Sequence, residues 1–284
     1  MASDARRLWQ LIEPYHAITY FAPECADAFT QIGLRGFWRG YFAGRAAPFG
    51  AVGPGPITAA FFGFEPAFVE RALPAIWQTV TPATAIGARR RGADRALGRL
   101  LPDALDSQDL AAAADLARRA ITGVAAAGRS VFGANTQLDW PDAPHLVLWH
   151  AATLIREHRG DGHVAALVAA GIDPCEAHML QVTASGAGLE TIAPYRGWSD
   201  DDWAAAAQRL RERGWLDATG ALTDTGMRAH DDIEATTDAL AREPLDRLGT
   251  RAAARLLELL LPIARELSRQ DAIRWPNPIG VPRP

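Results

Sequence analysis

The pattern of apolar and polar positions along the chain predicts a mostly α-helical protein. Apolar side chains recur at helical spacing through most of residues 1–142, which places them on one face of each predicted helix. The predicted helices in this range lie at 5–13, 24–32, 57–62, 66–80 and 108–127. The first is expected to end at Pro14, because its ring removes a backbone donor and clashes with the preceding turn. We therefore expect residues 1–142 to form an N-terminal helical domain.

Residues 144–163 are the most informative stretch of the chain. They begin as an almost entirely apolar helix and end in a dense run of His, Glu, Arg and Asp. A helix that is apolar on nearly every side belongs in the middle of a fold. The polar groups at its end are therefore expected beside a buried or half-buried space. A glycine-containing turn is expected between His158 and His163, so these side chains would converge only if the chain folds back.

The residue pattern in the second half of the chain predicts shorter helices and one strand-turn-strand unit. Two short helices are expected at 164–170 and 174–184, and Ser199 is placed to cap a third, with three aspartates in its first turn. Short antiparallel strands are expected on either side of the tight turn at 217–220, followed by a long helix. We place a domain boundary at residue 142, a second domain at 143–270, and an extended proline-rich tail at 271–284.

The second half also carries a family resemblance. The run LxxRGWLDATGALTDTG, which begins at Leu210, resembles the third helix and wing of winged-helix proteins of the multiple-antibiotic-resistance-regulator type. The whole chain resembles an uncharacterised actinobacterial family labelled helix-turn-helix. The resemblance implies a C-terminal winged-helix domain with a short two-stranded wing. It implies a fold and does not by itself imply DNA binding.

The residues that would touch DNA in such a fold are unusual for a DNA reader. The third helix of winged-helix regulators points its N-terminal end into the major groove. Here that end carries Asp200, Asp201 and Asp202, which would repel phosphates, and the predicted wing carries no Arg. The residues that could contact DNA instead are Arg91, Arg95 and Arg99, which form a basic stripe at helical spacing, together with Arg209.

Composition narrows the chemistry further. All 29 basic residues are Arg, so Schiff-base, pyridoxal phosphate and P-loop chemistries, which require Lys, are excluded. The net charge of −4 predicts no general attraction to nucleic acid or to anionic membranes. No apolar run is long enough to span a membrane. Cys25 and Cys175 form no CxxC pair, so we expect a cytoplasmic protein.

The candidate binding residues are aromatic, His, Arg and Glu side chains from two segments. They are Trp38, Tyr41, Arg45, Trp149, His150, Glu157, His158, Arg159 and His163. Arg45 is available for an anionic group in an aromatic pocket. His150 and His158 lack the spacing of an HExxH zinc site, so no metal ligand is predicted.

We therefore expect a protein that binds a small organic molecule between its domains. Two alternatives remain open: a DNA-binding transcriptional regulator, and a histidine-dependent enzyme that uses a metal or acid–base catalysis. The sequence does not identify a cofactor, and it leaves a homodimer open.

Overall fold

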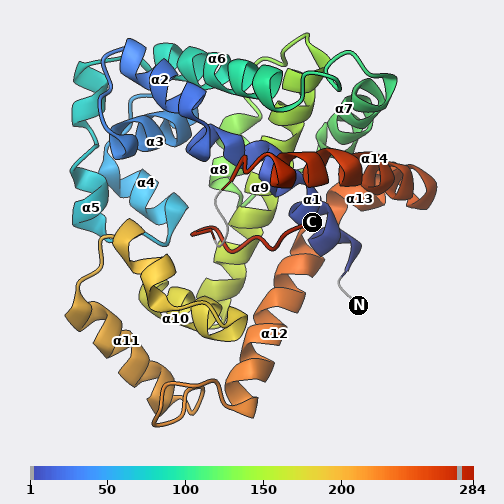
Figure 1. Ribbon diagram of the computed structural model, residues 1–284. Coiled ribbons are helices and arrows are strands. Elements are labelled where there is room, and N and C mark those ends of the chain that lie inside the picture. The colour runs from blue at the N-terminus through green and yellow to red at the C-terminus, as the bar shows by residue number, and fades with distance from the viewer. Residues whose placement is uncertain (1–2, 274–276) are drawn as a thin grey trace.

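The computed structural model describes residues 3–273 and 277–284 and confirms the mostly α-helical prediction (Figure 1). Its α-helices are α1 (Asp4–Phe21), α2 (Pro23–Gln31), α3 (Phe37–Ala46), α4 (Pro54–Phe61), α5 (Pro66–Glu70), α6 (Pro82–Leu100), α7 (Gln108–Ile121), α8 (Ser130–Asn135), α9 (Pro144–Ala169), α10 (Pro174–Ser185), α11 (Asp200–Glu212), α12 (Asp224–Leu240), α13 (Glu243–Leu248) and α14 (Thr250–Arg269). Short 3₁₀ helices lie at Ala47–Phe49, Ala75–Gln78, Leu189–Thr191 and Ala193–Tyr195.

The first helix does not end at Pro14, so that prediction is wrong. Pro14 lies inside α1, which runs on to Phe21. A proline in a helix interior costs about 3 kcal/mol. The side chains that follow it, Tyr15 and Ile18, are almost completely buried, and burying a large apolar side chain contributes about 1.5–3 kcal/mol. Packing of this second half of α1 therefore offsets the cost of the proline.

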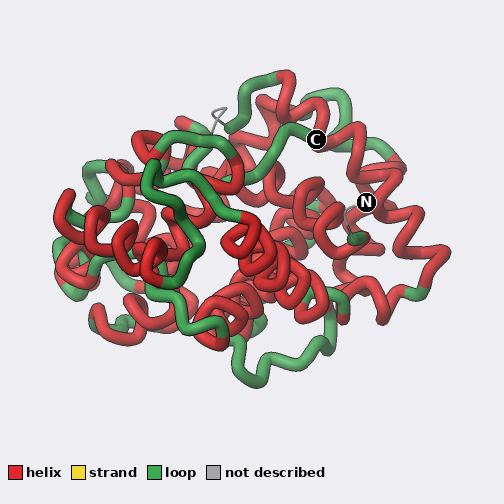
Figure 2. Tube along the Cα trace, turned by 90° about the horizontal axis from the view of Figure 1, so that it is seen from below, coloured by secondary structure: helices red, strands yellow, loops and turns green. Residues whose placement is uncertain are grey.

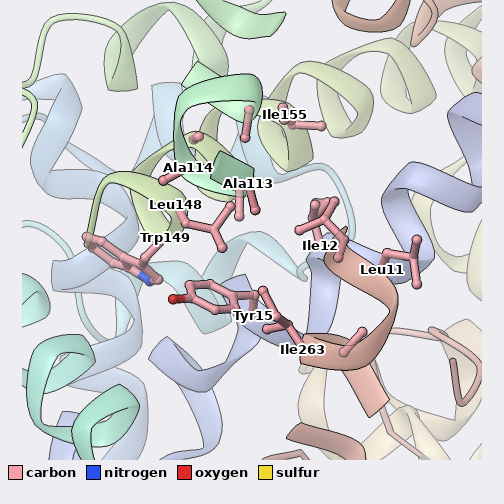
Figure 3. Packing of buried hydrophobic residues seen from close by; sticks show 14 of the residues in the cluster. Leu11, Ile12, Tyr15, Ala113, Ala114, Leu148, Trp149, Ile155 and Ile263 are labelled. Atoms are coloured by element: carbon pink, nitrogen blue, oxygen red, sulfur yellow. The ribbon is translucent and has the colours of Figure 1, made fainter. Parts of the chain in front are cut away.

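The central helix α9 is buried along most of its length, as its apolar composition predicts. Its first half packs with α1, α7 and α14 in the main hydrophobic core (Figure 3). Leu148 and Ala151 are fully buried, and the Nε1 atom of Trp149 donates a 3.0 Å hydrogen bond to Thr19 Oγ1. This core contains residues from before and after residue 142, so it does not separate two domains at that point. The division into domains at 1–142 and 143–270 therefore remains a prediction.

The predicted two-stranded wing is wrong. The described residues form no β-strand; Leu216 and Leu222 are joined only by an isolated antiparallel bridge, and Figure 2 shows helices and loops alone. This bridge lies in the connection between the end of α11 at Glu212 and the start of α12 at Asp224. Within the connection, the side chain of Asp217 accepts hydrogen bonds from the backbone amides of Thr219 and Ala221. Residues 217–221 therefore form a tight turn between the two bridged residues.

Helices α10, α11 and α12 lie at one end of the molecule and are called the α10–α12 layer here, although α12 also packs along α9 (Figure 1). The predicted cap of α11 is confirmed: Ser199 and Asp202 form a capping box.

Residues 277–284 form an irregular segment in which the side chain of Asn277 forms hydrogen bonds with both the backbone amide and the carbonyl oxygen of Val281. The prolines of this tail thus lie on a non-helical stretch, except Pro276, which lies outside the described residues. No helix in the described residues combines the length and apolar character needed to cross a membrane.

Candidate functional site

A cavity of about 490 Å³ lies between the N-terminal helices and the α10–α12 layer. Side chains of α1, α3, α4, α9, α10 and α12 line it, and the C-terminal segment adds residues 278–280 and 282. In Figure 1 this segment passes beside the lower half of α9. The polar end of α9 therefore faces a hollow space, as its composition predicts.

The expected turn between His158 and His163 is absent, because α9 continues through Gly160 and Gly162 to Ala169. At Gly162 a Cβ atom would lie 2.8 Å from Nη1 of Arg129, so the glycine makes room for that guanidinium. Arg129 donates hydrogen bonds to the carbonyl oxygens of His158 and Leu240 and so ties α9 to the end of α12. The unbroken helix places His163 in the cavity wall, away from His158.

The first charged group in the cavity is centred on Glu157. Arg156 Nη1 lies 2.8 Å from its Oε2 atom, and Arg45 Nη2 lies 3.3 Å from the same oxygen. Arg156 also pairs with the buried carboxylate of Glu13 at 3.4 Å. Burial alone would raise the pKa of Glu157, but the charges of Arg156 and Arg45 outweigh it and lower the pKa to about 2. Glu157 is therefore ionised at physiological pH.

A second charged group joins α1, α9 and α12 at another wall of the cavity. Arg6 pairs with Glu234 at 2.8 Å and with Asp238 at 3.0 Å. Arg159 contacts the same two carboxylates, each at 3.3 Å. Nearby, His163 shares a 2.9 Å hydrogen bond with a threonine of α12, and burial lowers the pKa of its ring to about 4. These contacts hold α12 against α1 and α9.

The third group lies where the connection between α10 and α11 meets α4. His178 Nε2 donates a 2.9 Å hydrogen bond to the carbonyl oxygen of Gly63, and Trp198 Nε1 contacts the same oxygen at 3.1 Å. Burial lowers the pKa of His178 to about 3, so its ring is neutral at physiological pH. The guanidinium of Arg196 lies over the ring of Phe64, 5.2 Å from its centroid.

The structure divides the predicted binding residues into two sets. Those that line the cavity are Tyr41, Arg45, Glu157, Arg159 and His163. Those that lie elsewhere are Trp38, in an aromatic cluster with Phe64 and Phe68; Trp149, in the main core; His150, against Trp140; and His158, against Phe132. The second set packs inward because each residue sits on the core-facing side of its helix.

Several cavity residues were not among the predicted ones. Arg156 adjoins Glu157, and its helical spacing from Arg159 and His163 is a sequence signal that places it on the same side of α9. Arg6, Glu13 and Arg196 come from segments far away in sequence, and no local pattern marks them.

The predicted DNA-contacting arginines do not form one surface. Arg95 and Arg99 on α6 contact Glu24 of α2, and Arg91 is exposed. Arg209 pairs with Asp173 and Glu176 inside the α10–α12 layer. Helices α6 and α11 lie at opposite ends of the molecule (Figure 1). A continuous basic surface across the stripe and α11 is therefore not present.

No group of three or more His, Cys, Asp or Glu side chains in residues 3–273 and 277–284 is arranged to hold a metal ion. The described part of the chain therefore gives no support to the alternative that this protein is an enzyme that uses a metal ion.

A short turn joins α9 to α10. It comprises residues 170–173 and contains Gly171 in the left-handed region, and a capping box of Asp173 and Glu176 starts the second helix. Two helices joined by a turn of this length with a glycine are typical of helix-turn-helix motifs. A sequence model of the Helix-turn-helix family matches residues 5–274. The chain belongs to this family. Comparison with curated proteins finds no match, and neither does comparison with solved structures.

Proposed function

We propose that this member of the Helix-turn-helix family binds a small organic molecule in the cavity between α1, α9, α10 and α12. The observation that carries the proposal is the cavity itself: about 490 Å³ is within the usual size of small-molecule sites, and the walls combine apolar and charged side chains. Phe61, Phe64 and Leu167 offer an apolar surface, while the Glu157 group offers fixed charges.

A neutral fluorescent probe tests whether the cavity accepts an organic molecule. N-phenyl-1-naphthylamine fluoresces strongly in apolar surroundings, so a saturable increase with one site per chain is expected. Ala184→Trp places a large ring in the cavity wall, where it would occupy space that the probe needs, and it should weaken binding roughly tenfold, which corresponds to about 1.4 kcal/mol. Ala204→Trp puts the same ring on the exposed face of α11 and should leave binding unchanged.

Absence of saturable binding to the wild-type protein, or equal affinities for the two tryptophan variants, would refute the cavity as a binding site. Native mass spectrometry of protein purified without chelator adds a second measurement. A mass above that of the polypeptide would identify a ligand that copurifies, and its loss in Ala184→Trp alone would assign it to the cavity.

DNA binding is the second candidate function, and family membership favours it. Helix α11 lies at the edge of the molecule with one face exposed, but that face carries Asp200 and Asp201. If α11 meets DNA, Asp200→Asn with Asp201→Asn should tighten binding to a mixed-sequence duplex, measured by fluorescence anisotropy at two salt concentrations. If the α6 stripe meets DNA instead, Arg91→Gln with Arg95→Gln should weaken it. No binding even at low salt would exclude both.

A further inference from the structure

Five arginines line the cavity, and four of them are neutralised by carboxylates. These four are Arg6 and Arg159, which share Glu234 and Asp238, and Arg45 and Arg156, which share Glu157. The fifth, Arg196, forms no ion pair within the described part of the chain. Its Nη1 and Nη2 atoms donate to the carbonyl oxygens of Tyr195, at 3.1 Å, and of Pro278, at 2.8 Å.

Arg196 is held in place from several directions. Its own carbonyl oxygen accepts a 2.9 Å hydrogen bond from the amide of Glu65, which anchors the connection between α10 and α11 to the start of α5. The ring of Phe64 lies under the guanidinium, and the bond to Pro278 ties it to the C-terminal segment. These contacts fix the position of the charge without cancelling it, because neither an aromatic ring nor a carbonyl dipole carries a net negative charge.

The charged groups that act on Arg196 are mainly other cations. Burial is the main cause that lowers the pKa of Arg196 to about 10; Tyr41 opposes this shift, and the charges of Arg45 and Arg156 add to it. Arg196 therefore stays protonated at physiological pH in a positive local potential. This wall of the cavity thus offers one cation, Arg196, that no carboxylate in the described part of the chain neutralises.

We infer that the cavity selects an organic ligand with one anionic group, such as a carboxylate or a sulfonate, and that Arg196 is the counter-ion of this group. The apolar body of the ligand would then lie along the phenylalanine wall formed by Phe61 and Phe64. Arg196 is half-buried and has lost part of its hydration, so a fixed anion that replaces this hydration is preferred here over a neutral or cationic head group. The inference rests on the proposed function, since it assigns a ligand class to the same cavity.

A matched pair of probes isolates this charge. 1-Anilinonaphthalene-8-sulfonate differs from N-phenyl-1-naphthylamine by a single sulfonate, and both report binding by fluorescence. The measured quantity is the ratio of the two dissociation constants, neutral over anionic. Arg196→Gln should lower this ratio at least about tenfold, because hydrogen bonds to charged groups contribute about 1.5–3 kcal/mol. Arg196→Lys keeps the charge and should retain most of the ratio.

Arg71→Gln is the matched control. Arg71 also lies over a phenylalanine, 5.3 Å from the centroid of Phe68, but it is exposed and does not line the cavity. The ratio of the two dissociation constants in Arg71→Gln should equal that of the wild-type protein. Unchanged affinity for the neutral probe shows that the Arg196→Gln variant is folded. If the ratio of dissociation constants is the same in wild-type protein and Arg196→Gln, the inference is wrong but the proposed function still stands. If the wild-type protein binds neither probe, the proposed function itself is wrong.

Discussion

Glu157 provides the sharpest test of the electrostatics of the cavity. It is 3% exposed and is held by Arg45 and Arg156, so replacing it with Gln removes the carboxylate that pairs with the buried Arg45 and leaves Arg156 with Glu13 alone. The pKa of Glu157 is about 2 in the folded protein and 4.5 for an unperturbed glutamate. At about 1.4 kcal/mol per pKa unit, this difference corresponds to about 3 kcal/mol of stability at pH 7. Breaking a buried ion pair has a cost of the same order.

The pH dependence follows from the direction of the pKa shift. A carboxylate whose folded pKa is depressed contributes stability above its unfolded pKa and loses it as the pH falls toward the folded pKa. The stability difference between wild-type protein and Glu157→Gln should therefore shrink from about 3 kcal/mol at pH 7 to about 1 kcal/mol at pH 3.

Urea denaturation followed by circular dichroism measures this difference at both pH values. The matched control is Glu258→Gln on α14, where the carboxylate is mostly exposed and lies 3.6 Å from Arg255. Its free energy of unfolding should change by less than about 0.5 kcal/mol. Equal stability of wild-type protein and Glu157→Gln at pH 7, or a difference that stays constant down to pH 3, would refute the reasoning.

Two further predictions concern helix packing and a second carboxylate. A Cβ atom on Gly92 would lie 2.7 Å from Cα of Cys25, so Gly92→Ala should lower the melting temperature. The control is Gly98→Ala in the same helix, whose Cβ atom would meet nothing within 4 Å and which should stabilise the protein by about 1 kcal/mol. Changes of the same sign in the two variants would contradict the close packing of α2 on α6. Burial raises the pKa of Asp161 to about 6, and a raised carboxyl pKa means that stability falls as the pH rises through it. The stability of wild-type protein relative to Asp161→Asn should therefore fall by about 2.4 kcal/mol between pH 4 and pH 7, and a pH-independent difference in urea denaturation would count against the shift.

The sequence by itself determined the helical class, the burial of the central helix and the presence of a hollow at its polar end. These follow from local patterns, because apolar spacing, caps and composition act within a few residues of one another. The same reasoning found the cap at Ser199 and included Arg45 and Glu157 among the cavity residues.

Tertiary structure decided which of the polar residues meet. Helix α1 continues through Pro14 because α7, α9 and α14 bury the part of the helix beyond it, and no local rule contains that contribution. The continuous path of α9 directs His163 into the cavity and leaves His158 against the core. Arg196 reaches the same cavity only because the chain packs its connection against the start of α5 and the C-terminal segment. Contacts between residues so distant in sequence depend on packing free energy summed over the whole molecule, which local pattern does not encode.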